Sequence, residues 1–282
     1  MKSRQHIVVS AENNPYLAWQ CKLFHYSCVT RLQQTPLFVV HERDKDWQPE
    51  FKEIVNSGGK VRAAPSYRTP ESDYSPRNTA GTLLEAATIG YNRDDFIVLC
   101  DPDMIFVRKA PFLNRLAAEH YSYLDYRAEV REAARRLCIS DVLMQQRKRE
   151  VSCGVPYVVP VAQARELGEA WLEAIDSFAP GPLEISMYSF GLAVIKLGLR
   201  LVLTGLVVTN FRDLDLVKSA DIIHYCYGND VWDKRQYFSS GMSSKVWHPS
   251  TKTRSGTVLG EIVSQLHEAG EFYSKKQVAS LG

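Results

Sequence analysis

FIVLCDPD, residues 96–103, joins five consecutive apolar residues to two acids. A short apolar run bounded by polar residues is typical of a strand buried on both faces, as in a parallel sheet covered by helices. Two carboxylates two positions apart on an extended chain share one face. We therefore expect Asp101 and Asp103 to converge where this strand ends, at the carboxyl edge where open α/β sheets bind ligands.

Strands and helices are expected to alternate on both sides of this run. Short β-branched stretches predict strands and amphipathic stretches predict helices, which indicates an α/β fold with a mixed, mostly parallel sheet flanked by helices. Asn14 is well placed to cap the first helix, with Pro15 at its first position. The predicted strands are 6–11, 37–41, a short one from 61, 96–100, 104–107, 153–160, 200–208 and 221–227. The predicted helices are 16–32, 79–90, 128–150, 162–178, 184–197 and 257–270.

The composition is that of a globular protein. Of the 282 residues, 45% are hydrophobic and 23% are charged, which excludes a disordered or collagen-like chain. The net charge of +2 does not mark the whole molecule as a binder of polyanions. The six cysteines form no C-x-x-C pair and no zinc-finger spacing, so we interpret them as reduced thiols, with a fully oxidised set as the alternative. No stretch approaches the roughly 20 apolar residues of a membrane span, so no membrane partner is expected.

A metal site is the first chemical prediction. Hard divalent cations such as Mn2+ or Mg2+ prefer carboxylate oxygens and bridge them to phosphates, which suits Asp101 and Asp103. His224 lies on the apolar stretch Ile222-Ile223-His224 and could complete such a site as a neutral imidazole. The alternatives are a turn capped by aspartates and a core histidine. Lys234 and Arg235 follow closely and could neutralise a diphosphate, or they could be an exposed loop pair.

A nucleotide site is predicted where the first strand ends. Ser10 and Ala11 lie at the exit of this strand, and Asn13 lies with Asn14 in the loop at the start of the following helix. Their side-chain amides and the backbone N–H groups there suit a uracil edge, a ribose or a phosphate. Asn78, at the end of the polar loop 65–78, is a further candidate for binding the nucleotide. Tyr16 and Trp19 could stack on a base, or they could be core residues.

Taken in order, several stretches resemble the plant hydroxyproline O-arabinosyltransferases and the related peptidyl-serine galactosyltransferases. The similarity covers nearly the whole chain, and the His-Tyr-x-Tyr-Gly stretch followed by Asp-Lys-Arg is its most specific part. The stretches are Ser10-Ala11, Tyr16-Leu17-Ala18-Trp19-Gln20, Asp101-Pro102-Asp103-Met104-Ile105-Phe106-Val107, Gly154-Val155-Pro156-Tyr157-Val158, Met187-Tyr188-Ser189-Phe190, Asp213-Leu214-Asp215, Ile222 to Asp230 and Trp232-Asp233-Lys234-Arg235.

The resemblance implies a GT-A fold, a UDP-sugar donor, a divalent metal such as Mn2+, and transfer with retention of anomeric configuration. It makes Asp101 and Asp103 the donor and metal residues, and His224 the remaining metal or diphosphate contact. Lys234 and Arg235 become a diphosphate clamp. The plant enzymes have an N-terminal membrane anchor, which we do not expect for this protein, and they have Glu where this sequence has Ser186. The nearest carboxylate, Glu184, is therefore the candidate catalytic carboxylate, and its expected role is that of a covalent nucleophile.

These observations lead to one functional expectation: a retaining glycosyltransferase that moves arabinose, galactose or glucose from a UDP-sugar to an acceptor hydroxyl. We expect a single domain, with a nucleotide-binding half at 1–110, an acceptor and metal-completing half at 111–250, and a C-terminal helix at 251–282. The alternatives are a nucleotidyltransferase or sugar-phosphate hydrolase with the same metal site, and a nucleotide-sugar-binding module. A cytoplasmic, bacterial or viral setting is expected. The acceptor could be a peptide, a small molecule or a hydroxylated DNA base, the last because the helix predicted at 128–150 is basic.

Overall fold

The strands of this computed structural model form two sheets. The structure describes residues 3–42, 46–70, 73–179, 183–209, 220–226 and 231–279. The larger has the order β3-β2-β1-β4-β7-β6-β8, and the smaller has the order β5-β10-β9. β1 runs parallel to β4 and β6 runs parallel to β8, whereas β7 runs antiparallel to both β4 and β6. The expected α/β fold with a mixed sheet is confirmed. The strands are β1 (Gln5–Glu12), β2 (Leu37–His41), β3 (Lys60–Ala64), β4 (Phe96–Cys100), β5 (Met104–Phe106), β6 (Ala117–His120), β7 (Cys153–Pro160), β8 (Val202–Thr204), β9 (Val207–Thr209) and β10 (Ile222–His224).

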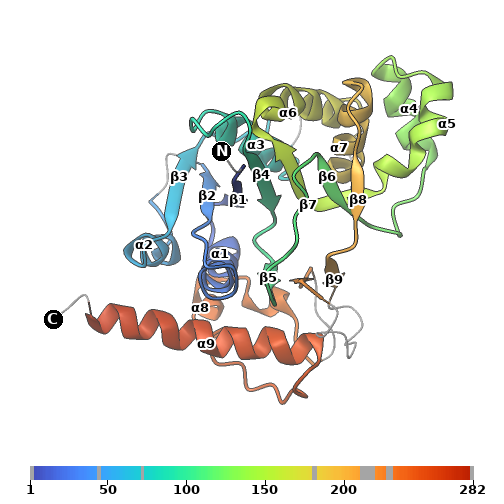
Figure 1. The fold of residues 1–282 in the computed structure, drawn as a ribbon. Helices are drawn as coiled ribbons and strands as arrows, with labels where there is room; N and C mark the ends of the chain where they lie inside the picture. The colour runs from blue at the N-terminus through green and yellow to red at the C-terminus, as the bar shows by residue number, and fades with distance from the viewer. Residues whose placement is uncertain are drawn as a thin grey trace. The chain divides into compact units, whose positions relative to one another are not determined.

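The chain divides into two compact units, and the first comprises Met1–Ser10, Ala64–Cys100 and Phe112–Gly205. In this unit α6 packs against both α3 and α7 (Figure 1). Tyr157 of β7 lies at the centre of its aromatic core, with ring centroids 4.0 Å from Phe190 and 5.1 Å from Trp171. The helices of this unit are α3 (Arg77–Ala87), α4 (Ala128–Arg136), α5 (Asp141–Arg147), the 3-10 turn η2 (Lys148–Val151), α6 (Val161–Asp176) and α7 (Ile185–Lys196).

The second unit comprises Ala11–Ala63, Asp101–Pro111 and Leu206–Gly282. Its long helix α9 lies beside α1 (Figure 1). Their shared core is aromatic: Trp19 is fully buried and stacks on Tyr225 at 6.1 Å, and Trp232 meets Tyr225 edge-on at 6.0 Å. The helices of this unit are α1 (Pro15–Ser27), the π-helix η1 (Cys28–Leu32), α2 (Pro49–Asn56), the 3-10 helix η3 (Lys234–Tyr237), α8 (Ser240–Ser243) and α9 (Val258–Ala279).

The start of the first helix follows the sequence prediction. Asn14 caps α1, because its side-chain oxygen accepts a hydrogen bond of 2.9 Å from the backbone N–H of Leu17, and Pro15 takes the first helical position. The predicted helix 16–32 is continuous in the structure, but its last five residues form the π-helix η1. The division of the chain into nucleotide-binding and acceptor halves stays a prediction.

The single basic helix predicted at 128–150 is wrong. The chain leaves the helical conformation after Arg136, because Cys138 adopts a left-handed φ of 59°. The N–H groups of Cys138 and Ile139 then bond back to the carbonyls of Arg135 and Ala134, which is the Schellman pattern that closes a helix. α5 begins only at Asp141, where the side chain of Ser140 accepts from the N–H of Leu143 at 3.2 Å.

The predicted strand 200–208 is also wrong as one element. It is two strands, β8 and β9, separated at Gly205 and Leu206. β8 pairs with β6 in the larger sheet, and β9 pairs with β10 in the smaller one. Four described elements that the sequence did not predict are α2, β6, η3 and α8. The predicted strand end at Tyr227, the stretch Asp213-Leu214-Asp215 and residues 228–230 lie outside the described residues.

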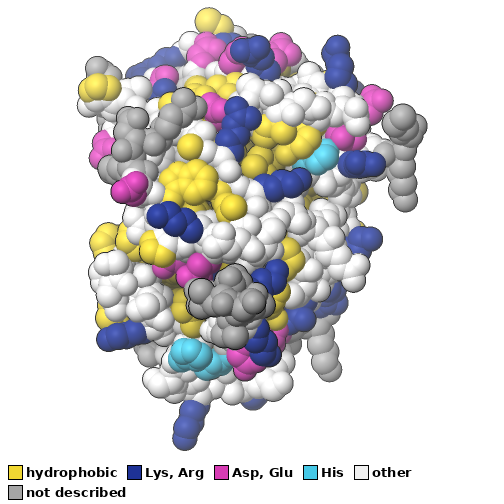
Figure 2. All heavy atoms as spheres, turned by 90° about the vertical axis from the view of Figure 1, so that its left-hand side faces the viewer, with side chains coloured by type: hydrophobic (Ala, Val, Ile, Leu, Met, Phe, Trp, Pro, Cys, Tyr) yellow, Lys and Arg dark blue, Asp and Glu magenta, His cyan; other side chains and the backbone are white. Residues whose placement is uncertain are grey.

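Three further expectations from the sequence concern membrane helices, the distribution of basic side chains and the cysteines. No described helix combines the length and the apolar character that crossing a membrane requires. On the face drawn in Figure 2, Lys and Arg side chains lie scattered among apolar and acidic ones and do not gather into one patch. None of the six cysteines, all of which are described, forms a disulfide.

Candidate metal centre

The backbone of the second unit brings the predicted ligands together. Asp101 follows β4 directly, and the chain turns through Pro102 before β5 begins at Met104. β10 pairs with β5 in antiparallel register, so that His224 lies opposite Met104. One step beyond this pair, the N–H of Tyr225 donates to the carbonyl oxygen of Asp103 at 2.9 Å. The pairing of two strands therefore places the imidazole beside the two carboxylates.

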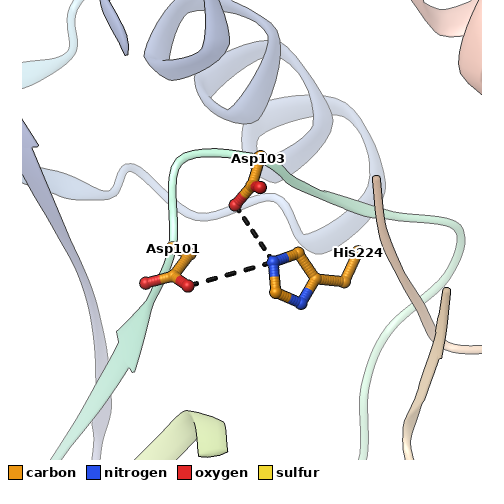
Figure 3. A group of neighbouring side chains, drawn as sticks. All are labelled: Asp101, Asp103 and His224. Carbon is orange, nitrogen blue, oxygen red and sulfur yellow. Dashed lines mark hydrogen bonds and ion pairs between the residues drawn. The ribbon is translucent and has the colours of Figure 1, made fainter. Parts of the chain in front are cut away.

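Figure 3 shows the ring nitrogen of His224 facing both carboxylates. His224 Nε2 lies 3.1 Å from Asp103 Oδ1 and 3.9 Å from Asp101 Oδ2. One ligand atom from each of the three residues lies within 4.8 Å of the other two. Carboxylate oxygens with one imidazole nitrogen are a donor set that suits Mn2+ and Mg2+, so the residues present fit a divalent ion.

A fourth charged side chain belongs to this cluster. Lys234 is only 7% exposed, and its ammonium group donates to Asp103 Oδ2, the carboxylate oxygen not used by His224. Lys234 opens η3, whose start is capped by Asp233 through a hydrogen bond of 2.8 Å from the N–H of Arg235. The Lys234 Nζ atom also lies 5.7 Å from the ring of Tyr16 and 5.9 Å from the ring of Tyr225. Lys234 is thus held between the acid and two aromatic rings.

The two aspartates differ in electrostatic environment. Burial, followed by repulsion from Asp103, raises the pKa of Asp101 to about 6, although His224 and Lys234 partly oppose this. Burial would also raise the pKa of Asp103, but Lys234 and His224 lower it well below its usual range. Asp103 is therefore the permanent anion of the site, and Asp101 becomes ionised as the pH rises through about 6.

The two cationic groups are stabilised by the same acid. Burial acts to lower the pKa of His224, but Cys226 and Asp103 raise it well above its usual value. Burial acts in the same way on Lys234, and Asp103 followed by Tyr16 raises the pKa of Lys234. An ion that binds the imidazole must therefore displace a proton from His224. Cys226, whose sulfur donates to the His224 carbonyl at 3.5 Å, is a neighbour of the site that the sequence reading did not single out.

Arg235 does not join this cluster. Its guanidinium group binds the carboxylate of Asp233 through Nε at 2.9 Å, and its side chain is 61% exposed. Of the predicted diphosphate clamp, the structure brings Lys234 alone to the acids. An adjacent pair of basic residues in sequence points in different directions on a tight helical turn, which explains why they separate.

The predicted nucleotide residues occupy several places. Asn13 is buried, and its amide bridges to the backbone of Asp46 at 2.8 Å and of Gln48 at 3.0 Å. Asn78 lies in the first turn of α3, where its side-chain oxygen accepts from the N–H of Tyr67 at 2.7 Å. In the structure the Asn13 amide binds the backbone of the segment before α2, and the Asn78 amide binds the backbone of the loop before α3.

The other predicted residues are divided between the units. Ala11 opens the second unit, which holds the metal centre, whereas Ser10, Asn78 and Glu184 belong to the first. Glu184 precedes α7 at its capping position, and its side chain makes no capping hydrogen bond. The donor-binding and catalytic roles of these residues stay predictions.

Of the two aromatic residues predicted to stack on a base or to lie in the core, Trp19 is a core residue. It is fully buried, and its indole N–H donates to the Tyr237 carbonyl at 3.2 Å. Tyr16 is partly exposed and lies beside Lys234, so it remains available for stacking. Phe238, which the sequence reading missed, lies 5.7 Å from the Tyr16 ring and is 71% exposed. Its sequence signal was an aromatic residue shortly after the Lys-Arg pair.

Comparison with known proteins bears on the fold. No family model and no curated protein matches the chain. A crystal structure of the galactosyltransferase LgtC in complex with donor and acceptor sugar analogues aligns with a TM-score of 0.50 and 13% identity, over 93% of this chain and 95% of that one. An active-site mutant of LgtC (TM-score 0.48, 12% identity, 94% and 95% coverage) and the bifunctional glycosyltransferase WbbM (0.46, 13%, 82% and 47%) also align. The resemblance to the plant arabinosyltransferases stays a prediction. The likeness to LgtC extends over the length of both chains, and the chain therefore has a GT-A glycosyltransferase fold.

Proposed function

We propose that this chain is a metal-dependent glycosyltransferase that transfers a sugar from a UDP-sugar to an acceptor hydroxyl with retention of anomeric configuration. The observation that supports this proposal is the cluster of Asp101, Asp103, His224 and Lys234 on a GT-A fold. Two acids and an imidazole suit a divalent ion, and a lysine beside them suits a phosphate. A nucleoside diphosphate sugar carries a diphosphate that such an ion and such a lysine can bind together.

In this proposal Asp101, Asp103 and His224 hold Mn2+ or Mg2+. When bound, such an ion acts as a Lewis acid on a diphosphate leaving group. Lys234 donates to the diphosphate oxygens and stabilises the negative charge that develops on them. Arg235, whose side chain is 61% exposed and forms an ion pair with Asp233, supplies a second cation to the diphosphate at longer reach. Tyr16 stacks against the nucleoside.

Two routes of sugar transfer are consistent with retention of anomeric configuration. In the version that we favour, the acceptor attacks from the side of the leaving group and a diphosphate oxygen takes the proton, so that no protein nucleophile is needed. In the alternative, Glu184 attacks the anomeric carbon as the bond to UDP breaks, which forms a covalent glycosyl-enzyme as in retaining glycosidases. The acceptor hydroxyl then displaces the Glu184 carboxylate and gives its proton to the diphosphate of the departed UDP. The absence of a capping hydrogen bond to the Glu184 side chain is compatible with either version.

The decisive experiment is a calorimetric titration of UDP into the protein with Mn2+ and with EDTA. Wild type should bind UDP only with Mn2+, and Asp103→Ala should lose this binding. Asp94→Asn is the matched control, because it removes one exposed acid from the same chain. UDP binding that is equal in Mn2+ and EDTA, or that survives in Asp103→Ala, would contradict the proposal.

The sugar and the acceptor are then identified by turnover. Release of UDP from a UDP-sugar supports transfer, release of pyrophosphate from a sugar phosphate and UTP identifies the nucleotidyltransferase alternative, and tight binding without turnover identifies a binding module. A nucleic-acid acceptor should show strong salt dependence of its KM. Three arginines of the basic region form ion pairs within it: Arg135 and Arg136 with Glu132, and Arg147 with Glu150. A peptide or small-molecule acceptor is therefore the first to test.

A further inference from the structure

Lys234 and a divalent ion would compete for one carboxylate, that of Asp103. Asp103 has two oxygens: Oδ1 receives His224 and Oδ2 receives the Lys234 ammonium group. The carboxylate of Asp103 is thus already neutralised by a cation that belongs to the chain. A divalent ion held by Asp101, Asp103 and His224 would bring a second cation to the same acid.

The surroundings of Lys234 make this competition strong. Its side chain is 9% exposed and that of Asp103 is 12% exposed, so water screens the charges weakly. On its other side the ammonium group faces the rings of Tyr16 and Tyr225 at 5.7 and 5.9 Å, and rings attract a cation less than a carboxylate does. Among the described residues, Asp103 is the acid that forms an ion pair with Lys234.

We propose that Lys234 is an internal counter-cation, which opposes metal binding at Asp103 in the absence of nucleotide and transfers to the diphosphate when nucleotide and metal bind together. This inference rests on the proposed function and deepens it. Once the ion neutralises Asp103, the Lys234 charge is in excess, and a diphosphate supplies the missing anion. Metal and nucleotide then bind cooperatively, since each removes the electrostatic cost of the other.

A different role for Lys234 predicts the opposite sign. If Lys234 only oriented Asp103 as a ligand, removing it would weaken metal binding. The orientation of Asp103 has other supports, namely the bond from His224 and the backbone bond from Tyr225 at 2.9 Å. A neutral residue at position 234 therefore distinguishes the two roles: metal binding becomes tighter if Lys234 repels the ion, and weaker if Lys234 orients Asp103.

The test uses Lys234→Met, which keeps the length and apolar stem of the side chain and removes its charge. Binding of Mn2+ alone is measured from the free-ion electron paramagnetic resonance signal, and binding of UDP is measured by calorimetry at saturating Mn2+. We expect Lys234→Met to bind Mn2+ alone about tenfold more tightly than wild type, because a buried like charge is gone. We expect it to bind UDP about tenfold more weakly, because a charge-assisted phosphate contact is gone.

Controls keep the outcomes distinct. Lys245→Met removes the same charge from an exposed position of the same unit and should leave both affinities unchanged. Lys234→Gln is measured alongside, and thermal unfolding in EDTA checks that both variants fold. If wild type binds Mn2+ and UDP but both neutral variants bind Mn2+ alone equally or more weakly, the counter-cation inference is overturned and the proposed function stands. If wild type binds neither Mn2+ nor UDP, both fail.

Discussion

The backbone N–H of Tyr225 donates a hydrogen bond of 2.9 Å to the carbonyl oxygen of Asp103. This bond continues the β5–β10 ladder, in which His224 lies opposite Met104. Because the ladder holds the two strands in register, the imidazole of His224 meets the carboxylate of Asp103 although 121 positions separate them in sequence. The placement of His224 beside Asp103 therefore depends on strand pairing, whereas Asp101 reaches the candidate metal centre through the turn at Pro102.

Metal binding should strengthen as the pH rises. The pKa of Asp101 is raised to about 6, and the pKa of His224 is raised well above its usual value. Below about pH 6 both ligands therefore carry protons that an ion must displace. We expect the Kd for Mn2+ to fall by about tenfold or more per pH unit between pH 5 and 6, where two protons compete with the ion, and to continue falling above pH 6.

Proton release gives the measurement an internal check. Calorimetry of Mn2+ binding at pH 7 in two buffers of different ionisation enthalpy should show net release of protons. His224→Asn should lose most of this release along with at least about tenfold in affinity, since a ligand and its proton disappear together. A pH-independent Kd with no proton release would show that His224 and Asp101 are not ligands.

The free energy of unfolding should reveal the cost of Asp101 in the metal-free protein. Its pKa in the folded state is about 6 against an ordinary 3.8, so the folded state binds the proton more tightly than the unfolded state does. The stability from this group is present below about pH 4 and is lost as the pH rises through 6. Asp101→Asn avoids the loss.

We therefore expect Asp101→Asn in EDTA to be more stable than wild type at pH 7.5, and about equal at pH 4. A third of the Asp101 side chain is exposed, so after solvent screening the gain is about 1 kcal/mol. Urea denaturation at the two pH values measures it, with Asp94→Asn as control. A variant that is less stable than wild type at pH 7.5 would mean that Asp101 is stabilised as an anion.

Tyr16 and Trp19 should respond differently to truncation. Trp19→Leu removes a fully buried ring and its hydrogen bond to Tyr237, so it should lower the free energy of unfolding by about 2 kcal/mol or more. Tyr16→Leu should change stability by less than about 1 kcal/mol but weaken UDP binding about tenfold, through loss of stacking. Denaturation and calorimetry on both variants test this. Unchanged UDP affinity in a folded Tyr16→Leu protein would remove Tyr16 from the nucleotide site.

Glu184 separates the two versions of the transfer reaction. With proton transfer to a diphosphate oxygen, Glu184→Ala should keep kcat within about threefold of wild type. If Glu184 were a nucleophile, kcat should fall by about a thousandfold or more. Glu166→Ala, an exposed acid of the same unit, is the control for loss of charge. Trapping of a glycosyl-enzyme on Glu184 in wild type would establish the covalent version.

Local patterns were sufficient for much of the secondary structure. The apolar run before Asp101 is β4, and the Asn14-Pro15 pair starts α1, because strand burial and helix capping are interactions between near neighbours in sequence. The end of α4 was missed for a local reason too. Cys138 adopts the left-handed conformation that glycine usually supplies, so the sequence carried no glycine signal for the break.

The assignment of β8 and β9 to different sheets could not be read from the apolar run that contains them. β8 belongs to the larger sheet because it pairs with β6, and β9 belongs to the smaller sheet because it pairs with β10. Such pairing between separate strands is not visible in the sequence of one apolar run. The same holds for Trp19, for which the sequence left stacking on a base and a place in the core both open, with the core favoured. Its burial against Tyr225 and Tyr237 decides between them.

The sequence by itself determined which residues have metal-binding chemistry: two acids at the end of a buried strand, and a histidine on another apolar strand. Only the tertiary structure decided that Asp101, Asp103 and His224 share one site, that Lys234 joins it, and that Arg235 turns to Asp233. The physical reason is range. Residue type and periodicity report preferences between near neighbours in sequence. A cluster of four ionisable side chains depends instead on strand register, and on whether each buried charge has an oppositely charged partner.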